Sequence, residues 1–369
     1  MNETKKLAFG LMRLPVKNKV VQTLIDIEET KKMADYFIEN GFTHFDTSIV
    51  YHGGASEKAF KSAVAERYDR DKFTITDKMP MFIIKSKSML EPTFNKELKR
   101  CGVDFFDYYW LHSLDDKSYQ TCEKTNAFEY MQKKKEEGKI IHTGFSFHGS
   151  AELLDKILTK HPEVEFVQLQ INYLDWEDEK VQSRKNYEVA RKHGKRIMVM
   201  EPIKGGKLAN PSPAAKKLLE EYDSTVSPAL WAIRFAASLD GVDFVLSGMS
   251  NFEQLKENVD AMKDFKPLTE EENALLLRVA EVIRKGIEIP CTACRYCVEA
   301  CPKNIPIPDY FNAYNEIKQD EKKAKADFRT FSEGKGKPSD CISCHCCEQH
   351  CPQHLPISEY MTKVSKEFK

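Results

Sequence analysis

Two runs of cysteine toward the C-terminal end of the chain have the residue types and the spacing of metal ligands. Each run reads C-x2-C-x2-C-x3-C-P; the first holds Cys291, Cys294, Cys297 and Cys301, and the second holds Cys341, Cys344, Cys347 and Cys351. Three closely spaced thiolates can wrap three corners of a cube of iron and sulfide, and the fourth, turned away by the proline, reaches the other cube. The spacing therefore predicts two [4Fe–4S] clusters.

The sequence around the two runs is duplicated at an offset of 50 residues. The segment 305–310, IPIPDY, matches the segment 355–360, LPISEY, so a whole structural unit is repeated. Zinc also binds C-x2-C pairs, but four cysteines closed by C-P, twice, favour iron and sulfide. Because four thiolates complete each site, we interpret the surplus Cys346 as a packed small residue and the nearby His345, His350 and His354 as non-ligands.

These features resemble the two-cluster ferredoxins, over about residues 288–369. The resemblance implies that one cluster is held by Cys291, Cys294, Cys297 and Cys351, and the other by Cys341, Cys344, Cys347 and Cys301. The charged stretch from Ile317 to Lys337 is longer than the compact ferredoxins carry. Helix-like stretches follow each C-P, so we expect a small, mainly helical ferredoxin-like domain.

The rest of the chain holds a second set of candidate residues, whose placement depends on the elements that carry them. Short β-type runs recur about every 30 residues, with helical patterns such as Ser56–Tyr68 and Asn126–Gly138 between them. Alternating strands and helices give a parallel sheet, and eight units close into a (β/α)8 barrel. The alternative is an open, doubly wound sheet, which the lack of an early G-x-G-x-x-G fingerprint weakens. The eight expected strands are Leu7–Leu11, Thr43–Thr47, Phe73–Asp77, Phe106–Leu111, Ile141–Phe145, Phe166–Ile171, Ile197–Met200 and Phe244–Ser247.

In a barrel of this kind the chemistry lies at the C-terminal ends of the strands. Asp46, Lys78 and His112 fall at three of these ends, and Tyr51 lies in the loop after Asp46. Each of them alone has a structural interpretation, such as a turn aspartate. Together, these four polar residues of different chemistry predict an active site at the C-terminal end of the barrel.

The same residues resemble the first signature of the aldo/keto reductase family. Residues 41–57 read GFTHFDTSIVYHGGASE, and Thr76-Asp77-Lys78 and Tyr109-Trp110-Leu111-His112 complete the family's catalytic tetrad. The resemblance spans roughly residues 7–265. It implies that Tyr51 gives a proton to a carbonyl oxygen, Lys78 lowers the pKa of that tyrosine, Asp46 pairs with the lysine and His112 orients the carbonyl. Hydride arriving at a carbonyl carbon leaves charge on oxygen, which is why an acid is needed there.

The resemblance also implies contacts to a nicotinamide cofactor, and here the match is partial. Ser146 and Gln170 match the residues that hold the nicotinamide amide, and Glu257 and Asn258 match the adenine side. The family's asparagine beside the serine is replaced by Phe147, and its stacking tyrosine by Met200. The basic residues that bind the 2′-phosphate in the family are replaced by Gly248 and Gln254. Three alternatives follow: NADH is preferred; Lys204, Lys207 or Lys256 supplies the missing charge; or nicotinamide binding has been lost.

Composition sets the remaining expectations. The chain has 369 residues and a formal net charge of −1, with 41% hydrophobic and 31% charged residues. No basic surplus favours nucleic acid, and no apolar run is long enough to span a membrane, so we expect a cytoplasmic protein. Only Cys101 and Cys122 precede the two runs, which places a boundary between a barrel at 1–287 and a cluster domain at 288–369.

We therefore expect an oxidoreductase of aldo/keto reductase type that interconverts a small carbonyl and an alcohol, with NADH or NADPH. Hydride transfer moves two electrons at once, whereas a [4Fe–4S] cluster passes one. The clusters therefore suggest electron transfer with a partner such as a ferredoxin or a flavoprotein. Two alternatives remain: a retired barrel that acts as scaffold for an electron carrier, or an active reductase whose clusters are only structural.

Overall fold

The computed structural model describes residues 5–18, 21–317 and 321–368. The chain forms two compact units. One comprises the chain up to Pro202 together with Ile233–Leu268, and the other comprises Ile203–Ala232 together with the chain from Thr269 onward. None of the helices in the described part of the chain is both long and apolar enough to cross a membrane.

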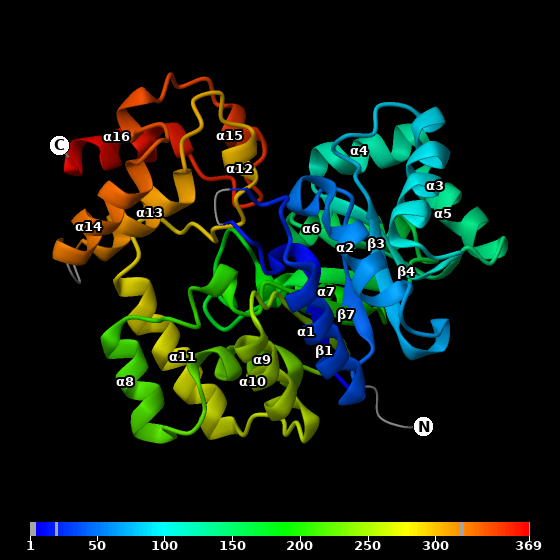
Figure 1. Cartoon of the computed structure of the whole chain (residues 1–369), viewed down its shortest axis with the longest axis horizontal. Coiled ribbons are helices and arrows are strands. Elements are labelled where there is room, and N and C mark those ends of the chain that lie inside the picture. Colours follow the sequence, from blue (N-terminus) through cyan, green and yellow to red (C-terminus); the bar gives the residue numbers. More distant parts are fainter. Residues whose placement is uncertain (1–4, 19–20, 318–320, 369) are drawn as a thin grey trace. The chain divides into compact units, whose positions relative to one another are not determined.

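The first unit contains a closed barrel of eight parallel strands, in which each strand pairs with the next and β8 pairs with β1 (Figure 1). All eight strands expected from the sequence are confirmed, and the doubly wound sheet is excluded. The strands are β1 (Leu7–Gly10), β2 (His44–Asp46), β3 (Thr74–Met79), β4 (Phe106–Leu114), β5 (Ile140–Phe147), β6 (Phe166–Gln170), β7 (Arg196–Met200) and β8 (Val242–Ser247).

Large side chains pack together within the barrel. Tyr108, Trp110, Phe166 and Phe244 pack there with smaller apolar neighbours. A Cβ on Gly144 would lie 2.4 Å from the Trp110 ring, so only glycine leaves room for this indole. The barrel is thus a packed core rather than a pore, which leaves the C-terminal ends of the strands as the place for a site.

Helices alternate with the strands, and their ends follow the sequence closely. Asp26, Asp115 and Thr269 each cap a helix by accepting a hydrogen bond from a backbone N–H of the first turn. The helices up to the cluster region are α1 (Ile27–Glu39), α2 (Ser56–Phe60), α3 (Leu90–Cys101), α4 (Asp116–Thr125), α5 (Ala127–Glu136), α6 (Ala151–Lys160), α7 (Ser183–Lys192), α8 (Pro213–Tyr222), α9 (Pro228–Ser238), α10 (Phe252–Lys263) and α11 (Glu270–Lys285).

The C-terminal part of the second unit is helical, as expected. Its helices are α12 (Tyr296–Glu299), α13 (Ile307–Glu316), α14 (Glu321–Ser332), α15 (Cys346–Gln349) and α16 (Ile357–Glu367) (Figure 1). The sequence duplication is also a backbone duplication. Residues at positive φ recur 50 positions apart: Ala293 with Ser343, Arg295 with His345, and Asn304 with His354. The long charged excursion forms α14; residues 318–320 lie outside the described part.

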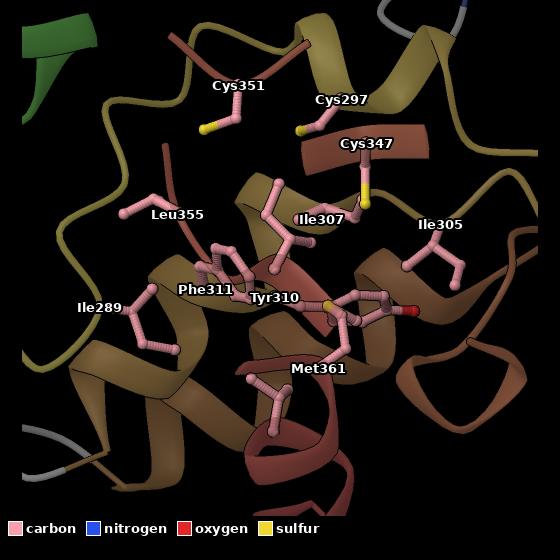
Figure 2. Close-up of a cluster of buried hydrophobic side chains, with 12 residues drawn as sticks. Ile289, Cys297, Ile305, Ile307, Tyr310, Phe311, Cys347, Cys351, Leu355 and Met361 are labelled. Carbon is pink, nitrogen blue, oxygen red and sulfur yellow. The ribbon is translucent and has the colours of Figure 1, made fainter. Parts of the chain in front are cut away.

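An apolar core holds these helices together. Tyr310 and Phe311 of α13 pack with Leu355 and with Met361 of α16 (Figure 2). Cys297, Cys347 and Cys351 are buried in the same cluster, so three of the predicted ligands are part of this core. Burial of the cysteines therefore depends on the duplicated helices packing against each other.

Candidate functional site

The three strand-end residues of the predicted tetrad come together at one mouth of the barrel, because β2, β3 and β4 are neighbours. Lys78 Nζ donates to Asp46 Oδ1 at 2.7 Å and to the backbone oxygen of Thr47 at 2.7 Å. Both side chains are buried, with Lys78 0% and Asp46 2% exposed. Two strong acceptors hold this buried ammonium in a fixed position.

Tyr51 and His112 complete the group. Tyr51 begins the short 3-10 turn Tyr51–Gly54, and its ring centre lies 4.9 Å from Lys78 Nζ. The rings of Tyr51 and His112 meet edge to face with centres 5.9 Å apart, and Phe82 lies 5.5 Å from His112. All four tetrad residues are buried and in mutual reach, as a site for one small reacting group requires.

Electrostatics in this pocket favour the neutral forms of Tyr51 and His112. Burial, with the carboxylates of Asp46, Asp77 and Glu201, raises the pKa of Tyr51 well above its ordinary value. The family resemblance implies that Lys78 lowers the pKa of Tyr51, but in this structure burial and the three carboxylates raise it. Burial, and then the charge of Lys78, lowers the pKa of His112 well below its ordinary value. At neutral pH the phenol therefore holds a proton to give, and the imidazole is uncharged.

Three residues that the sequence did not single out support the tetrad. The Ser48 hydroxyl lies 3.2 Å from His112 Nδ1, and Gln168 Nε2 donates to Asp46 Oδ2 at 3.4 Å. His52 accepts from the Leu14 N–H at Nε2 (3.1 Å) and contacts the Gln22 oxygen through Nδ1 (2.7 Å). His52 thus ties the Tyr51 turn to the loop after β1. Gln168 lies two residues before Gln170 on β6, so strand periodicity alone points it at the same interior.

Three of the four expected nicotinamide contacts already have hydrogen-bond partners. Ser146, at the end of β5, accepts from the Ser113 N–H at 2.6 Å, and Gln170, at the end of β6, donates to Asp175 at 2.8 Å. On α10, Asn258 donates to Ser247 Oγ at 3.1 Å, whereas Glu257 is exposed. Binding a nucleotide through these residues requires some of these bonds to be exchanged.

The end of β8 has a cation that the sequence did not reveal. Side-chain carbons of Arg13 lie 3.2 to 3.3 Å from the place that a Cβ on Gly248 would take. Glycine at 248, where the family carries a basic residue, therefore admits an arginine from the loop after β1. Lys256, by contrast, forms an ion pair with Asp260, and Lys204 is buried. Arg13 thus places a cation beside Gly248, the position at which the family resemblance implies a basic residue.

A buried acidic cluster lies behind the tetrad, on the side of β3 that faces α2 and α3. Asp77, next to Lys78, accepts from the Lys78 N–H at 2.8 Å and from the Cys101 thiol at 3.2 Å. Glu57 pairs with Arg100, and a Glu57 oxygen lies within 4.8 Å of ligand atoms of Asp77 and Cys101. Burial raises the pKa of Asp77 to about 6, because its charge is poorly solvated and Asp46 is close.

The eight run cysteines line two small cavities, and each cavity draws on both runs. Cys341, Cys344, Cys347 and Cys301 line one, and Cys291, Cys294, Cys297 and Cys351 line the other. Ile307 and Ile357, which are equivalent in the duplication, contribute to both cavities. Figure 2 shows the Cys347 sulfur close to Ile307, with the Cys297 and Cys351 sulfurs beyond it. Cys346 does not line either cavity.

The donor set of each cavity fits a [4Fe–4S] cluster. Four thiols, none of them in a disulfide, surround a space otherwise lined mainly by apolar side chains. The Thr292 hydroxyl lines the cavity of Cys291, Cys294, Cys297 and Cys351, is buried and has no hydrogen-bond partner among the described residues. A buried hydroxyl without a partner is costly, and cluster sulfur would accept its hydrogen bond.

Two family models match this chain, one over most of its length and one near its C-terminal end. The model of the aldo/keto reductase family matches residues 6–281, and that of the 4Fe-4S dicluster domain matches residues 290–355. Among curated proteins, an uncharacterized oxidoreductase of Bacillus subtilis (strain 168), YqkF, is 25% identical over 298 residues. The match covers 73% of this chain and 90% of that protein.

Solved structures share the barrel fold. The holo form of the aldo-keto reductase AKR11C1 from Bacillus halodurans has a TM-score of 0.61 at 22% identity, covering 74% of this chain and 91% of that one. An aldo/keto reductase from Klebsiella pneumoniae, solved in complex with NADP and acetate, has a TM-score of 0.60 at 19% identity, with coverage of 74% and 91%. At these identities the likeness is one of fold.

Proposed function

Because this chain belongs to the aldo/keto reductase family, we propose that its barrel interconverts a small carbonyl compound and an alcohol, with Tyr51 as the proton donor. That it is an oxidoreductase with a 4Fe-4S dicluster domain follows from the family matches. The observation that carries the proposal is the buried Asp46–Lys78 pair, which lies beneath Tyr51 at the barrel mouth.

Proton movement follows from the positions of these side chains. A nicotinamide cofactor held by Ser146, Gln170, Glu257 and Asn258 would supply the hydride that the carbonyl carbon needs. Tyr51, neutral at pH 7, then gives its proton to the oxygen, and the phenolate that forms is stabilised by the ammonium of Lys78. His112 is neutral, and its Nδ1 lies 3.2 Å from the Ser48 hydroxyl. We propose that this hydroxyl donates to Nδ1, so that the imidazole proton lies on Nε2 and can be donated to the carbonyl oxygen. Asp46 holds the Lys78 ammonium in place beside the phenolate.

Nicotinamide binding is supported by the barrel relatives, one of which was solved with NADP. We propose that Ser146, Gln170, Glu257 and Asn258 form the cofactor contacts. Arg13, packed on Gly248, would then approach a 2′-phosphate, because a guanidinium binds phosphate oxygens in pairs. In this proposal Arg13 supplies the charge in place of Lys204, Lys207 or Lys256, and NADPH is favoured.

We propose that residues 288–369 bind two [4Fe–4S] clusters with crosswise ligands, each taking three cysteines from one run and one from the other. The four thiols around each cavity support this assignment. Each cluster would carry one electron, so the pair together would carry the two electrons that, with one proton, make up the hydride that a nicotinamide brings to the carbonyl. We therefore propose that the clusters exchange electrons with an external carrier for the reaction of the barrel.

The barrel chemistry is tested with anaerobically purified, cluster-loaded protein. NADH and NADPH oxidation is followed with a panel of small aldehydes and ketones, for the wild type, Tyr51→Phe and Tyr108→Phe. Tyr108 is a matched control, because it is also a buried barrel tyrosine whose pKa is raised, to about 12, by burial. We expect turnover to fall about 10² to 10⁴-fold in Tyr51→Phe only, with nucleotide binding kept. Equal turnover in the two variants would refute the role of Tyr51.

A further inference from the structure

Thr292 brings a buried hydroxyl to the cavity that Cys291, Cys294, Cys297 and Cys351 line. The residue is 1% exposed, and its hydroxyl has no hydrogen-bond partner among the described residues. A buried donor that is left unpaired destabilises the fold. A polar side chain in this place therefore indicates an acceptor that the protein itself does not supply.

The equivalent residue of the second run has no hydroxyl. Ile342 also follows the first cysteine of its run, but it is apolar and 59% exposed. Ser358 does bring a hydroxyl to the second cavity, where its oxygen lies 3.4 Å from His345 Nδ1. Of these two cavity hydroxyls, only that of Thr292 is without a partner in the part of the chain that the structure describes.

Charged side chains around the first cavity do not take the place of this hydroxyl. Arg295 lines the cavity, but its guanidinium makes two hydrogen bonds to Asp309, of 2.9 and 2.8 Å. Because the two side chains have opposite charges, the pair brings no net charge to the cavity. Apart from Thr292, Arg295 and Gln353, the described residues that line the cavity are cysteines and apolar side chains.

Burial makes a cluster in this cavity harder to reduce. Cys297 and Cys351 are buried and Cys294 is half-buried, whereas Cys344, the equivalent of Cys294 in the second run, is exposed. A [4Fe–4S] core with four thiolates is already negative, and reduction adds one more negative charge. Water reaches the first cavity less, so the added charge must be stabilised by donors of the protein.

We propose that Thr292 donates a hydrogen bond to a sulfur of the first-run cluster, the one held by Cys291, Cys294, Cys297 and Cys351, and so raises its reduction potential. The inference rests on the proposed binding of two clusters. The sulfur carries more negative charge after reduction, so the hydrogen bond is stronger in the reduced form and stabilises it. Thr292 thus offsets part of the penalty that burial places on reduction.

The test is a potentiometric titration of the anaerobic, cluster-loaded protein with dithionite and redox mediators, followed by EPR. Thr292→Val keeps the shape of the side chain and removes the hydroxyl. It should lower one of the two midpoint potentials and leave the other unchanged. The expected fall in the ratio of reduced to oxidised cluster at a fixed potential is about three- to tenfold, a shift of about 30 to 60 mV for one electron. Thr292→Ala should lower the same potential, and Thr292→Ser, which keeps the hydroxyl, should retain the wild-type value.

The matched control is Ile342→Val, which shortens the side chain at the equivalent position of the second run, where there is no hydroxyl to lose. It should change neither potential. Iron and sulfide content report whether both clusters are present in each protein. With both clusters present, an unchanged potential in Thr292→Val, or a shift in Thr292→Ser as large as that in Thr292→Ala, would overturn the role of Thr292. Fewer than two clusters in the wild type would refute the cluster assignment itself, and the role of Thr292 with it.

Discussion

Replacing Lys78 by methionine should cost more stability than any other single change at the site. Lys78 is fully buried, and its ammonium donates to Asp46 and to the Thr47 oxygen, both at 2.7 Å. Methionine keeps most of the volume but leaves the Asp46 carboxylate buried; within the described part of the chain, its remaining side-chain donor is Gln168, at 3.4 Å. Breaking a buried pair by removing one partner costs about 3 to 5 kcal/mol. We expect Lys78→Met to lose that much free energy of unfolding.

Urea unfolding of the anaerobic protein, followed by tryptophan fluorescence, measures this loss, because Trp110 is buried within the barrel interior. The double variant Asp46→Asn/Lys78→Met removes both charges and should be more stable than Lys78→Met alone by about 2 kcal/mol or more. If Lys78→Met cost less than about 1 kcal/mol, or if the second change brought no recovery, Asp46 and Lys78 would not form a coupled, buried ion pair.

Three further predictions concern the other sites. Cys301→Ala should damage the second-run cluster and spare the first, read from EPR and iron content; damage confined to the first-run cluster would contradict crosswise ligation. Burial raises the pKa of Asp77 to about 6. Protonated Asp77 therefore contributes its full stabilisation of the fold below the pKa of about 4 that it has in the unfolded chain, and this stabilisation is lost as the pH rises through 6. Asp77→Asn should therefore have a free energy of unfolding about 2 to 3 kcal/mol above that of the wild type at pH 7.5, and one close to that of the wild type at pH 4. Equal urea midpoints for the two proteins at pH 7.5 would contradict the raised pKa of Asp77. Arg13→Gln should raise the KM for NADPH at least tenfold and leave that for NADH unchanged, and a parallel rise in both would assign Arg13 a structural role.

The barrel could be predicted from the sequence because its signal is local. Eight apolar runs at regular spacing, each followed by a helical pattern, leave little choice of topology. The rule that chemistry lies at strand ends then selects Asp46, Lys78 and His112, and the structure brings them together. The cysteine runs are equally local. Their spacing predicts the donor set, and the duplication explains why equivalent residues line both cavities.

What the sequence could not show depends on contacts between distant segments. Arg13 reaches Gly248 only because β1 and β8 close the barrel. The pKa of Tyr51 is raised rather than lowered because burial and three carboxylates outweigh the nearby ammonium. The exposed Ile342 and the buried Thr292 occupy equivalent places in the repeat, so only the surrounding chain distinguishes them.

The measurement that tests the central claim most directly asks whether the barrel site and the clusters take part in one reaction. The clusters are reduced chemically, excess reductant is removed, and a carbonyl substrate is added with and without nicotinamide. Cluster reoxidation is followed by absorbance in the wild type and in Tyr51→Phe. We expect the carbonyl to speed reoxidation in the wild type and much less in Tyr51→Phe. Equal reoxidation rates in both proteins, together with normal nicotinamide-driven turnover after cluster loss, would contradict the link and leave the clusters structural or a separate carrier.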